Sequence, residues 1–210
     1  SGINVPSKAF GEFVEQEFTT PSITAQDLKE KMDANEKMVI LDSRPMKEFN
    51  RMNIPGAFNC PGAELVYRVT DASLDSETLV VVNCAGRTRS IIGCQSLVNA
   101  GISNPVVALK DGTMGWHLAG FELEKGQNRS APQVSQRGLE RSKAMAKTVS
   151  KKYKIQHISD SKLLSFQNQS QERSLFLLDV RSPDEFESGH LPGSKSAPGG
   201  QLVQATDEYV

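Results

Sequence analysis

The chain has 210 residues, with 24 Lys and Arg against 25 Asp and Glu, so its formal net charge is −1. This balance leaves no large field for a polyanion such as nucleic acid, and no apolar run approaches the ~20 residues that a membrane-spanning helix requires. Three Cys and three His at irregular spacings give no zinc pattern, so we expect no metal and no cofactor. Few cysteines without a paired framework predict a reducing compartment, with the cytoplasm as the default.

Residues 1–21 have no periodic apolar pattern that would make a domain by itself and are expected to be a connector. Beyond them, capping signals and spacing predict helices over about 24–34, 47–51, 63–69 and 90–99. Apolar runs predict strands at 38–41, near 57, at 79–83 and at 106–109. Short apolar strands that alternate with helices predict an α/β fold with a parallel sheet covered on both faces.

Cys84 follows the strand expected at 79–83 and precedes a helix, and ligands bind at the carboxyl ends of strands in such sheets. The nucleophilic thiolate is scarce at neutral pH for an ordinary cysteine of pKa about 8.5. Inward-facing N–H groups of the loop, the helix dipole, and the charges of Arg87 and Arg89 would stabilise the anion. Because no His flanks Cys84, the predicted activation is electrostatic.

Such a pocket would also favour a cysteine persulfide, whose terminal sulfur is anionic, and would attract an anionic donor such as thiosulfate. The alternative is that Cys84 is a buried small hydrophobe, as most free cysteines are. Two arginines in the loop favour the reactive interpretation. Cys60 and Cys94 are expected to be packing residues, and each is a candidate partner for a disulfide with Cys84 under oxidation.

Five motifs follow one another along the chain, namely Leu41-Asp42-Ser43-Arg44, Glu48-Phe49, Ile54-Pro55-Gly56-Ala57, Cys84-Ala85-Gly86-Arg87-Thr88-Arg89 and Gly112-Thr113-Met114-Gly115-Trp116. In this order they resemble a rhodanese domain over about residues 23–126. The resemblance implies a five-stranded parallel sheet and a sulfurtransferase. Such an enzyme moves a sulfane sulfur from thiosulfate or a similar small donor to cyanide or a thiol, through a persulfide on Cys84. The substrate-binding residues would be Ala85, Gly86, Arg87, Thr88 and Arg89.

The length of the reactive loop distinguishes the sulfurtransferases of this family from the related cysteine phosphatases. Four residues lie between Cys84 and Arg89, whereas the cysteine phosphatase signature has five, so a phosphatase or arsenate reductase is disfavoured. Within the family, members that use mercaptopyruvate have a small uncharged reactive loop, whereas members that use thiosulfate have basic residues in it. The two arginines of this loop therefore favour thiosulfate. A catalytically silent binding or regulatory module is the competing hypothesis.

A second, partial copy follows at an offset of 137 residues, since 176–181 repeats 39–44 and Glu185-Phe186 repeats Glu48-Phe49. The counterpart of Cys84 would be position 221, beyond Val210, so we expect one candidate active site. The expected organisation is a connector at 1–21, a rhodanese domain at 22–126, a linker with a helix at 127–156, and a partial second domain at 157–210 without its reactive loop. The chain is expected to be a fragment of a protein similar to bacterial proteins with several rhodanese modules.

Asp42 and Arg44 close the strand at 38–41, and the pair recurs as Asp179 and Arg181. Recurrence in a copy that lacks the reactive loop predicts a structural ion pair rather than catalysis. Arg44 could still help to hold an anion near Cys84, and both residues are possible supporting residues of the site.

Two other features concern partners. The basic helix expected within 127–156 is interpreted as a solvated face rather than a surface for nucleic acid or membrane. The strand expected at 175–178 is too apolar for an open sheet edge. We expect this strand to pack either on the first domain or against another chain. In the second case, the chain would form a homo-oligomer through the incomplete second domain.

Overall fold

The computed structural model describes residues 6–73, 75–169 and 171–210. One sheet of five parallel strands has the order β1-β5-β4-β2-β3. The strands are β1 (Ser22–Ile23), β2 (Met38–Asp42), β3 (Phe58–Asn59), β4 (Leu79–Asn83) and β5 (Val106–Leu109). Because every neighbouring pair is parallel, all carboxyl ends lie at one edge of the sheet. The predicted α/β fold is therefore confirmed.

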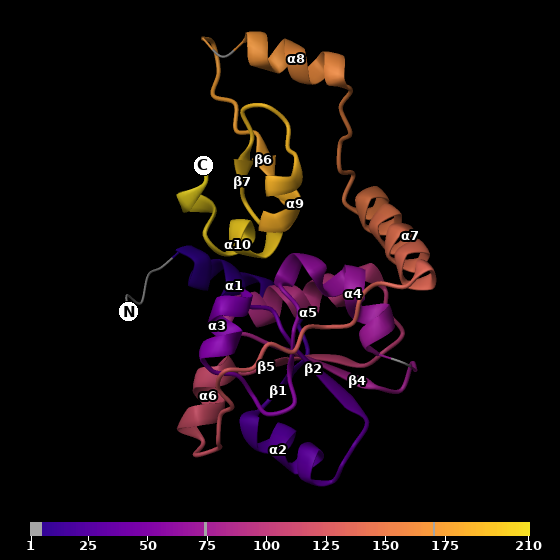
Figure 1. Ribbon diagram of the computed structural model, residues 1–210, viewed down its shortest axis with the longest axis vertical. Coiled ribbons are helices and arrows are strands. Elements are labelled where there is room, and N and C mark those ends of the chain that lie inside the picture. The colour runs from indigo at the N-terminus through magenta and orange to yellow at the C-terminus, as the bar shows by residue number, and fades with distance from the viewer. Residues whose placement is uncertain (1–5, 74, 170) are drawn as a thin grey trace.

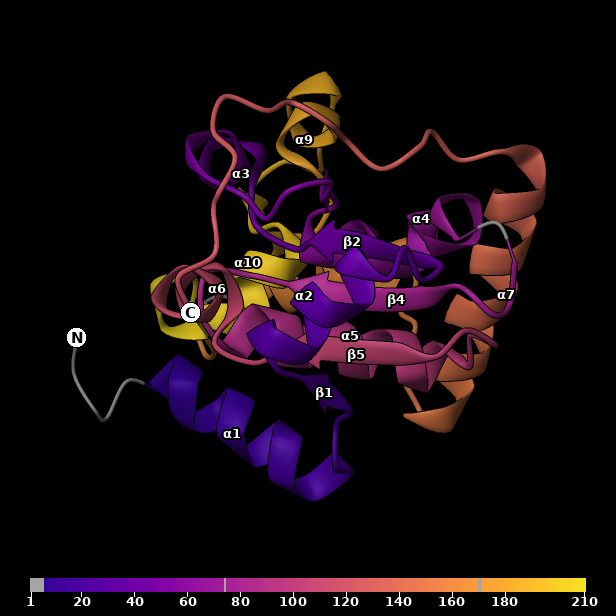
Figure 2. The same ribbon diagram turned by 90° about the horizontal axis from the view of Figure 1, so that it is seen from below.

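Helices cover both faces of this sheet, as Figure 1 and Figure 2 show from two sides. Alternation along β4 divides the core, since Val80 and Val82 face one apolar cluster and Val81 faces the other. The first cluster contains residues of α1 (Pro6–Phe18), α4 (Leu65–Ala72) and α5 (Thr88–Ala100). The second contains residues of α2 (Ala25–Asp33), α3 (Met46–Arg51) and α6 (Gly112–Leu118).

Local signals set the ends of several helices. The Thr24 hydroxyl caps α2 by accepting a hydrogen bond from the Asp27 N–H at 3.1 Å. Gly101, with φ 74°, closes α5 in the left-handed conformation. The 3-10 turn η1 (Gly62–Glu64) precedes α4, so the single helix expected at 63–69 is a turn followed by a helix.

The sequence did not predict α1, which lies within the segment expected to be a connector. It packs along α5, where a Cβ atom on Gly11 would lie only 3.1 Å from the Thr88 Cα. Of its apolar residues, Val14 is buried, whereas Phe10, Phe13 and Phe18 are exposed. A helix with so narrow a buried stripe gives a weak periodic signal.

The remainder of the chain begins with the linker helix α7 (Gln136–Lys152), which packs on α4 and α5 through Met145. It is followed by α8 (Asp160–Asn168), β6 (Leu178–Asp179), α9 (Pro183–Ser188), β7 (Lys195–Ser196), α10 (Gly199–Gln204) and the 3-10 turn η2 (Thr206–Glu208). In the register of β6 and β7, Leu178 pairs with Lys195. The pair of Leu41 with Phe58 is the same register 137 residues earlier, so the two copies share local structure.

The second copy sits against the first, with α10 contacting η1, α5 and α1 (Figure 1). The expectation of a strand at 175–178 was wrong in its bounds, because β6 comprises only Leu178–Asp179 and Phe176 is 52% exposed. Packing on the first domain is made by α10 rather than by that apolar run. Within the described residues, no helix combines the length and apolarity needed to cross a membrane.

Candidate active site

Cys84 lies immediately after β4, at the carboxyl edge of the sheet, and its side chain is 2% exposed. Its Sγ is 3.4 Å from the hydroxyl oxygen of Ser90, which itself donates to the carbonyl oxygen of Arg87 at 2.9 Å. The structure therefore places the thiol at the predicted position, with a rotatable hydroxyl beside it.

The loop 85–87 runs from Cys84 into the first turn of α5. Within the described residues, the backbone N–H groups of Ala85, Gly86 and Arg87 donate to no protein acceptor. These groups, together with the N-terminal end of α5, form a donor-rich environment of the kind that binds anions. Thr88 is partly covered by α1, because its hydroxyl donates to the carbonyl oxygen of Ser7 at 3.2 Å.

The start of α6 supports this loop from behind. The Thr113 N–H and hydroxyl both donate to the Cys84 carbonyl oxygen, at 2.8 and 3.1 Å, and the Met114 N–H donates to the Ala85 carbonyl oxygen at 3.0 Å. Gly112 has φ 54°, and a Cβ atom there would lie 2.3 Å from the Cys84 carbonyl oxygen. Only glycine fits this approach, so the motif at 112–116 fixes the position of the reactive loop.

Both loop arginines are paired with carboxylates, which the sequence did not predict. The Arg89 guanidinium donates to both oxygens of Glu48 on α3, at 2.7 and 2.9 Å, and its side chain is only 10% exposed. Arg87 donates to Glu12 at 3.2 Å and to Glu15 at 2.5 Å, both on α1. The positive charge of each loop arginine is therefore shared with at least one carboxylate.

These pairs shift the pKa values of their members. Burial alone would lower the pKa of Arg89, but the hydrogen bond and charge of Glu48 outweigh it and raise that pKa. For Glu48 the directions are opposite. Burial alone would raise its pKa, but the guanidinium groups of Arg89 and Arg44 outweigh burial and lower that pKa. The pair is therefore charged throughout the neutral range.

Asp42 and Arg44 form a buried bracket rather than an anion site. The two side chains make paired hydrogen bonds of 2.8 and 2.7 Å, and Arg44 also donates to the Met52 carbonyl oxygen at 2.7 Å. Asp42 further accepts from the Asn83 amide at 3.0 Å, which ties the bracket to the residue before Cys84. The second copy repeats it, since Arg181 donates to Asp179 and to the Gly189 carbonyl oxygen. This supports the interpretation as a structural pair.

The reactive loop lines a cleft of about 490 Å³. Its lining residues are Ser7, Lys8, Glu12, Cys84, Ala85, Gly86, Arg87, Thr88, Arg89, Asp111, Met114, Gly115, Leu118 and Gln204. Gln204 belongs to α10, so the second copy provides part of the wall. Its Oε1 atom is buried and has no hydrogen-bond partner among the described residues. Sequence reasoning missed Gln204 because only the packing of the two copies brings it there.

Cys60 and Cys94 are fully buried, as expected of packing residues. Burial raises the pKa of the Cys94 thiol to about 12 and raises that of Cys60 as well. Within the described residues, no group of His, Cys, Asp and Glu side chains is arranged to hold a metal ion.

The chain is similar in sequence and structure to several known proteins. The sequence profile of the Rhodanese-like domain family matches residues 24–119 and 161–209. The crystal structure of a thiosulfate sulfurtransferase from Pseudomonas aeruginosa is 51% identical with a TM-score of 0.94, covering 99% of this chain and 39% of that one. An HTH-type transcriptional regulator from Mycobacterium tuberculosis is 30% identical over 105 residues, which are 50% of this chain and 45% of the regulator. The chain thus spans less than half the length of these two relatives.

Proposed function

The chain belongs to the rhodanese-like domain family, and we propose that it is a thiosulfate sulfurtransferase that works through a persulfide on Cys84. One observation carries the proposal. Cys84 lines a cleft where the N–H groups of 85–87 have no protein acceptor among the described residues. The likeness to a thiosulfate sulfurtransferase over 99% of this chain supports the same substrate class.

The reaction proceeds by two exchanges at sulfur. The Cys84 thiolate attacks the outer sulfur of thiosulfate, so a new S–S bond forms and the old one breaks, and sulfite leaves with the electron pair. Cyanide or a thiolate then attacks the terminal sulfur of the persulfide, and the Cys84 thiolate is regenerated. No net oxidation occurs in either step, because the sulfane sulfur passes unchanged between nucleophiles.

The residues of the loop act by stabilising negative charge. The N–H groups of Ala85, Gly86 and Arg87 hold the terminal sulfur of the persulfide, and the Ser90 hydroxyl, which lies 3.4 Å from Sγ, turns to donate to the anion. Arg87 and Arg89 provide positive charge for thiosulfate and departing sulfite, and Thr88 begins the helix that supports the loop. Asp42 and Arg44 act indirectly, by holding Asn83 and the end of β2.

A small-molecule donor and acceptor are sufficient partners for this chemistry, and we place the reaction in the cytoplasm. The reactive domain comprises residues 22–126, and the partial domain at 157–210 serves as a wall of the cleft. A homo-oligomer is not needed to cover the second copy, because α10 already packs on the first domain.

The experiment that tests the function is sulfur loading. After thiosulfate treatment, the protein should gain one sulfur, about 32 Da, that maps to Cys84 and disappears on addition of cyanide. The Cys84→Ser variant should keep its unfolding midpoint and lose thiosulfate-dependent thiocyanate formation, while Cys94→Ala should keep that activity. Absence of the mass gain in the wild-type protein would favour a catalytically silent module, and turnover by Cys84→Ser would exclude the persulfide route.

A further inference from the structure

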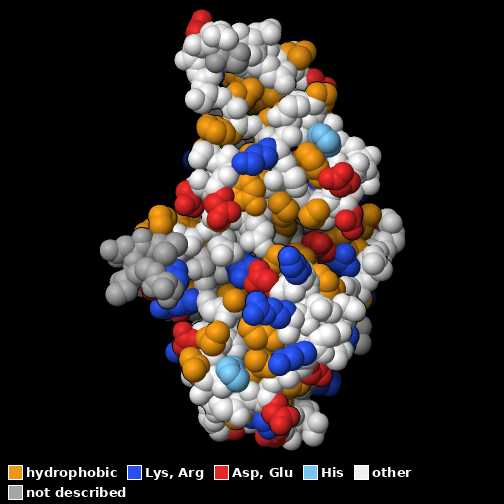
Figure 3. Space-filling model, turned by 60° about the vertical axis from the view of Figure 1, so that its left-hand side comes forward, with side chains coloured by type: hydrophobic (Ala, Val, Ile, Leu, Met, Phe, Trp, Pro, Cys, Tyr) orange, Lys and Arg blue, Asp and Glu red, His pale blue; other side chains and the backbone are white. Residues whose placement is uncertain are grey.

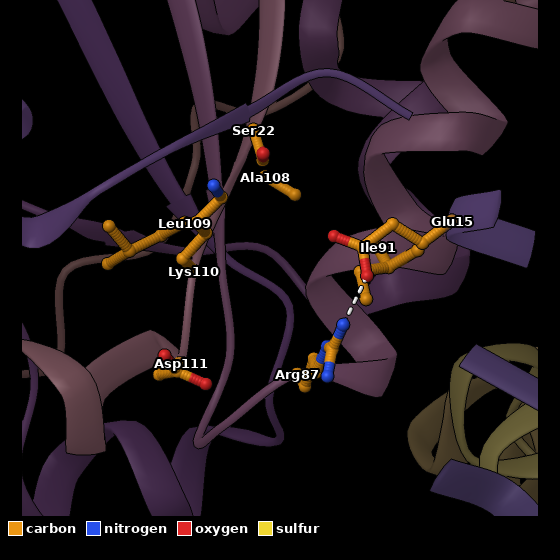
Figure 4. A pocket seen from close by; sticks show the side chains of 8 residues that line it. All are labelled: Glu15, Ser22, Arg87, Ile91, Ala108, Leu109, Lys110 and Asp111. Atoms are coloured by element: carbon orange, nitrogen blue, oxygen red, sulfur yellow. Dashed lines mark hydrogen bonds and ion pairs between the residues drawn. The ribbon is translucent and has the colours of Figure 1, made fainter. Parts of the chain in front are cut away.

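Arg87 separates two cavities. On one side is the Cys84 cleft, and on the other is a pocket of about 280 Å³ between α1 and the edge of the sheet, drawn in Figure 4. Arg87 and Asp111 line both. Figure 4 shows the Arg87 side chain directed toward Glu15, with Asp111 on its other side. The loop arginine is therefore held at the boundary of the cleft rather than within it alone.

Two carboxylates of α1 hold this guanidinium. Its two terminal nitrogens donate to Glu12 and Glu15, and Glu12 itself lines the Cys84 cleft. The hydrogen bond to Glu15 raises the pKa of Arg87, with a smaller opposing contribution from burial. Figure 3 shows basic and acidic side chains side by side in the middle part of this face of the molecule. A dianion entering the cleft thus meets a guanidinium that already has negatively charged partners.

The packing of α1 makes this arrangement a fixed feature. Gly11 lies against Thr88 so closely that a Cβ atom would be 3.1 Å from the Thr88 Oγ1, and the Thr88 hydroxyl donates to the Ser7 carbonyl oxygen. Glu12 and Glu15 are therefore held one turn apart beside the loop. The helix lies outside the residues that the family profile matches, which begin at 24.

We propose that Glu12 and Glu15 are positioning residues that set the affinity of the cleft for dianionic sulfur oxyanions. They compete with thiosulfate for Arg87, which weakens donor binding, and they recapture Arg87 when sulfite leaves, which speeds product release. This inference rests on the proposed function, because it assigns Arg87 to the donor anion. It predicts that the α1 carboxylates tune binding through Arg87 and not through the overall charge of the helix.

The test measures binding separately from turnover. In the Cys84→Ser protein, which forms no persulfide, the Kd values of thiosulfate and sulfite are measured by NMR titration of the loop amides. Adding Glu12→Gln and Glu15→Gln should lower both Kd values about three- to tenfold, since exposed ion pairs of this kind are each worth up to about 1 kcal/mol. With Cys84 present, the same two changes should lower the KM for thiosulfate and strengthen inhibition by sulfite.

Two controls separate this mechanism from a general charge effect. Glu17→Gln removes one charge from the same helix at a residue that forms no ion pair among the described residues, and it should leave the Kd within twofold. In an Arg87→Gln background, the two glutamate changes should also shift the Kd less than twofold. An unchanged Kd in the double variant, or an equal shift without Arg87, would overturn the inference. Failure of the wild-type protein to form a persulfide would instead refute the proposed function.

Discussion

The backbone approach at Gly112 makes the sharpest prediction about the reactive loop. In Gly112→Ala, the new Cβ atom would lie 2.3 Å from the Cys84 carbonyl oxygen and 2.8 Å from the Gly86 nitrogen. Both neighbours are backbone atoms, so the loop or α6 must move by about 1 Å to restore ordinary contact. A misplacement of about 1 Å can cost about 100-fold in rate, and we expect that loss in kcat/KM for thiosulfate.

The same substitution should also destabilise the fold. An alanine at φ 54° carries left-handed strain of about 1–2 kcal/mol. Overpacking adds about 1–3 kcal/mol. Urea unfolding followed by the fluorescence of Trp116, the only tryptophan, measures the total. Gly101→Ala is the matched control, since its φ is 74° but nothing lies within 4 Å of the added Cβ. Gly101→Ala should lower the free energy of unfolding by the strain contribution alone and keep full activity. A kcat/KM of Gly112→Ala within threefold of this control would refute the reasoning.

Two predictions concern pH. Because burial raises the pKa of Cys94 to about 12, the unfolded thiol ionises first, and stability should fall above pH ~8.5 by up to about 1.4 kcal/mol per pH unit. Urea unfolding at pH 8–10 should show a shallower slope for Cys94→Ala, and an equal slope would contradict this. Burial would raise the pKa of Glu48, but Arg89 lowers it, so its contribution is present above pH ~4.3 and lost on acidification. Glu48→Gln should cost about 1 kcal/mol at pH 7, after allowance for solvent screening, and nothing near pH 3; an equal cost at both pH values would refute the ion pair.

The sequence was sufficient where local pattern and repetition determine the structure. The buried strand β4, the helix that follows Cys84 and the bracket of Asp42 with Arg44 all depend on neighbours within one motif or on a repeated one. The register of β6 with β7 follows the first copy residue for residue. These features could be predicted because short-range spacing specifies them.

Contacts between distant segments could not be read in the same way. Glu15 reaches Arg87 across 72 positions, and Glu48 reaches Arg89 across 41. The motif Glu48-Phe49 was recognised, but its carboxylate gave no sign of its partner. A pair of loop arginines therefore indicated a strongly basic cleft, whereas tertiary packing places a carboxylate on each of them.

The position of the second copy follows from the repeat itself. A Cβ atom on Gly200 would lie 3.2 Å from the Gly62 Cα, and Gly199 lies against Ala63. Gly62 and Ala63 are the counterparts of Gly199 and Gly200 at the offset of 137, so equivalent residues of the two copies meet, as in an approximately twofold contact. Small residues there let the backbones of η1 and α10 approach. That contact fixes the end of α10, and with it Gln204, over the Cys84 cleft. The size of the cleft is consequently a property of both copies.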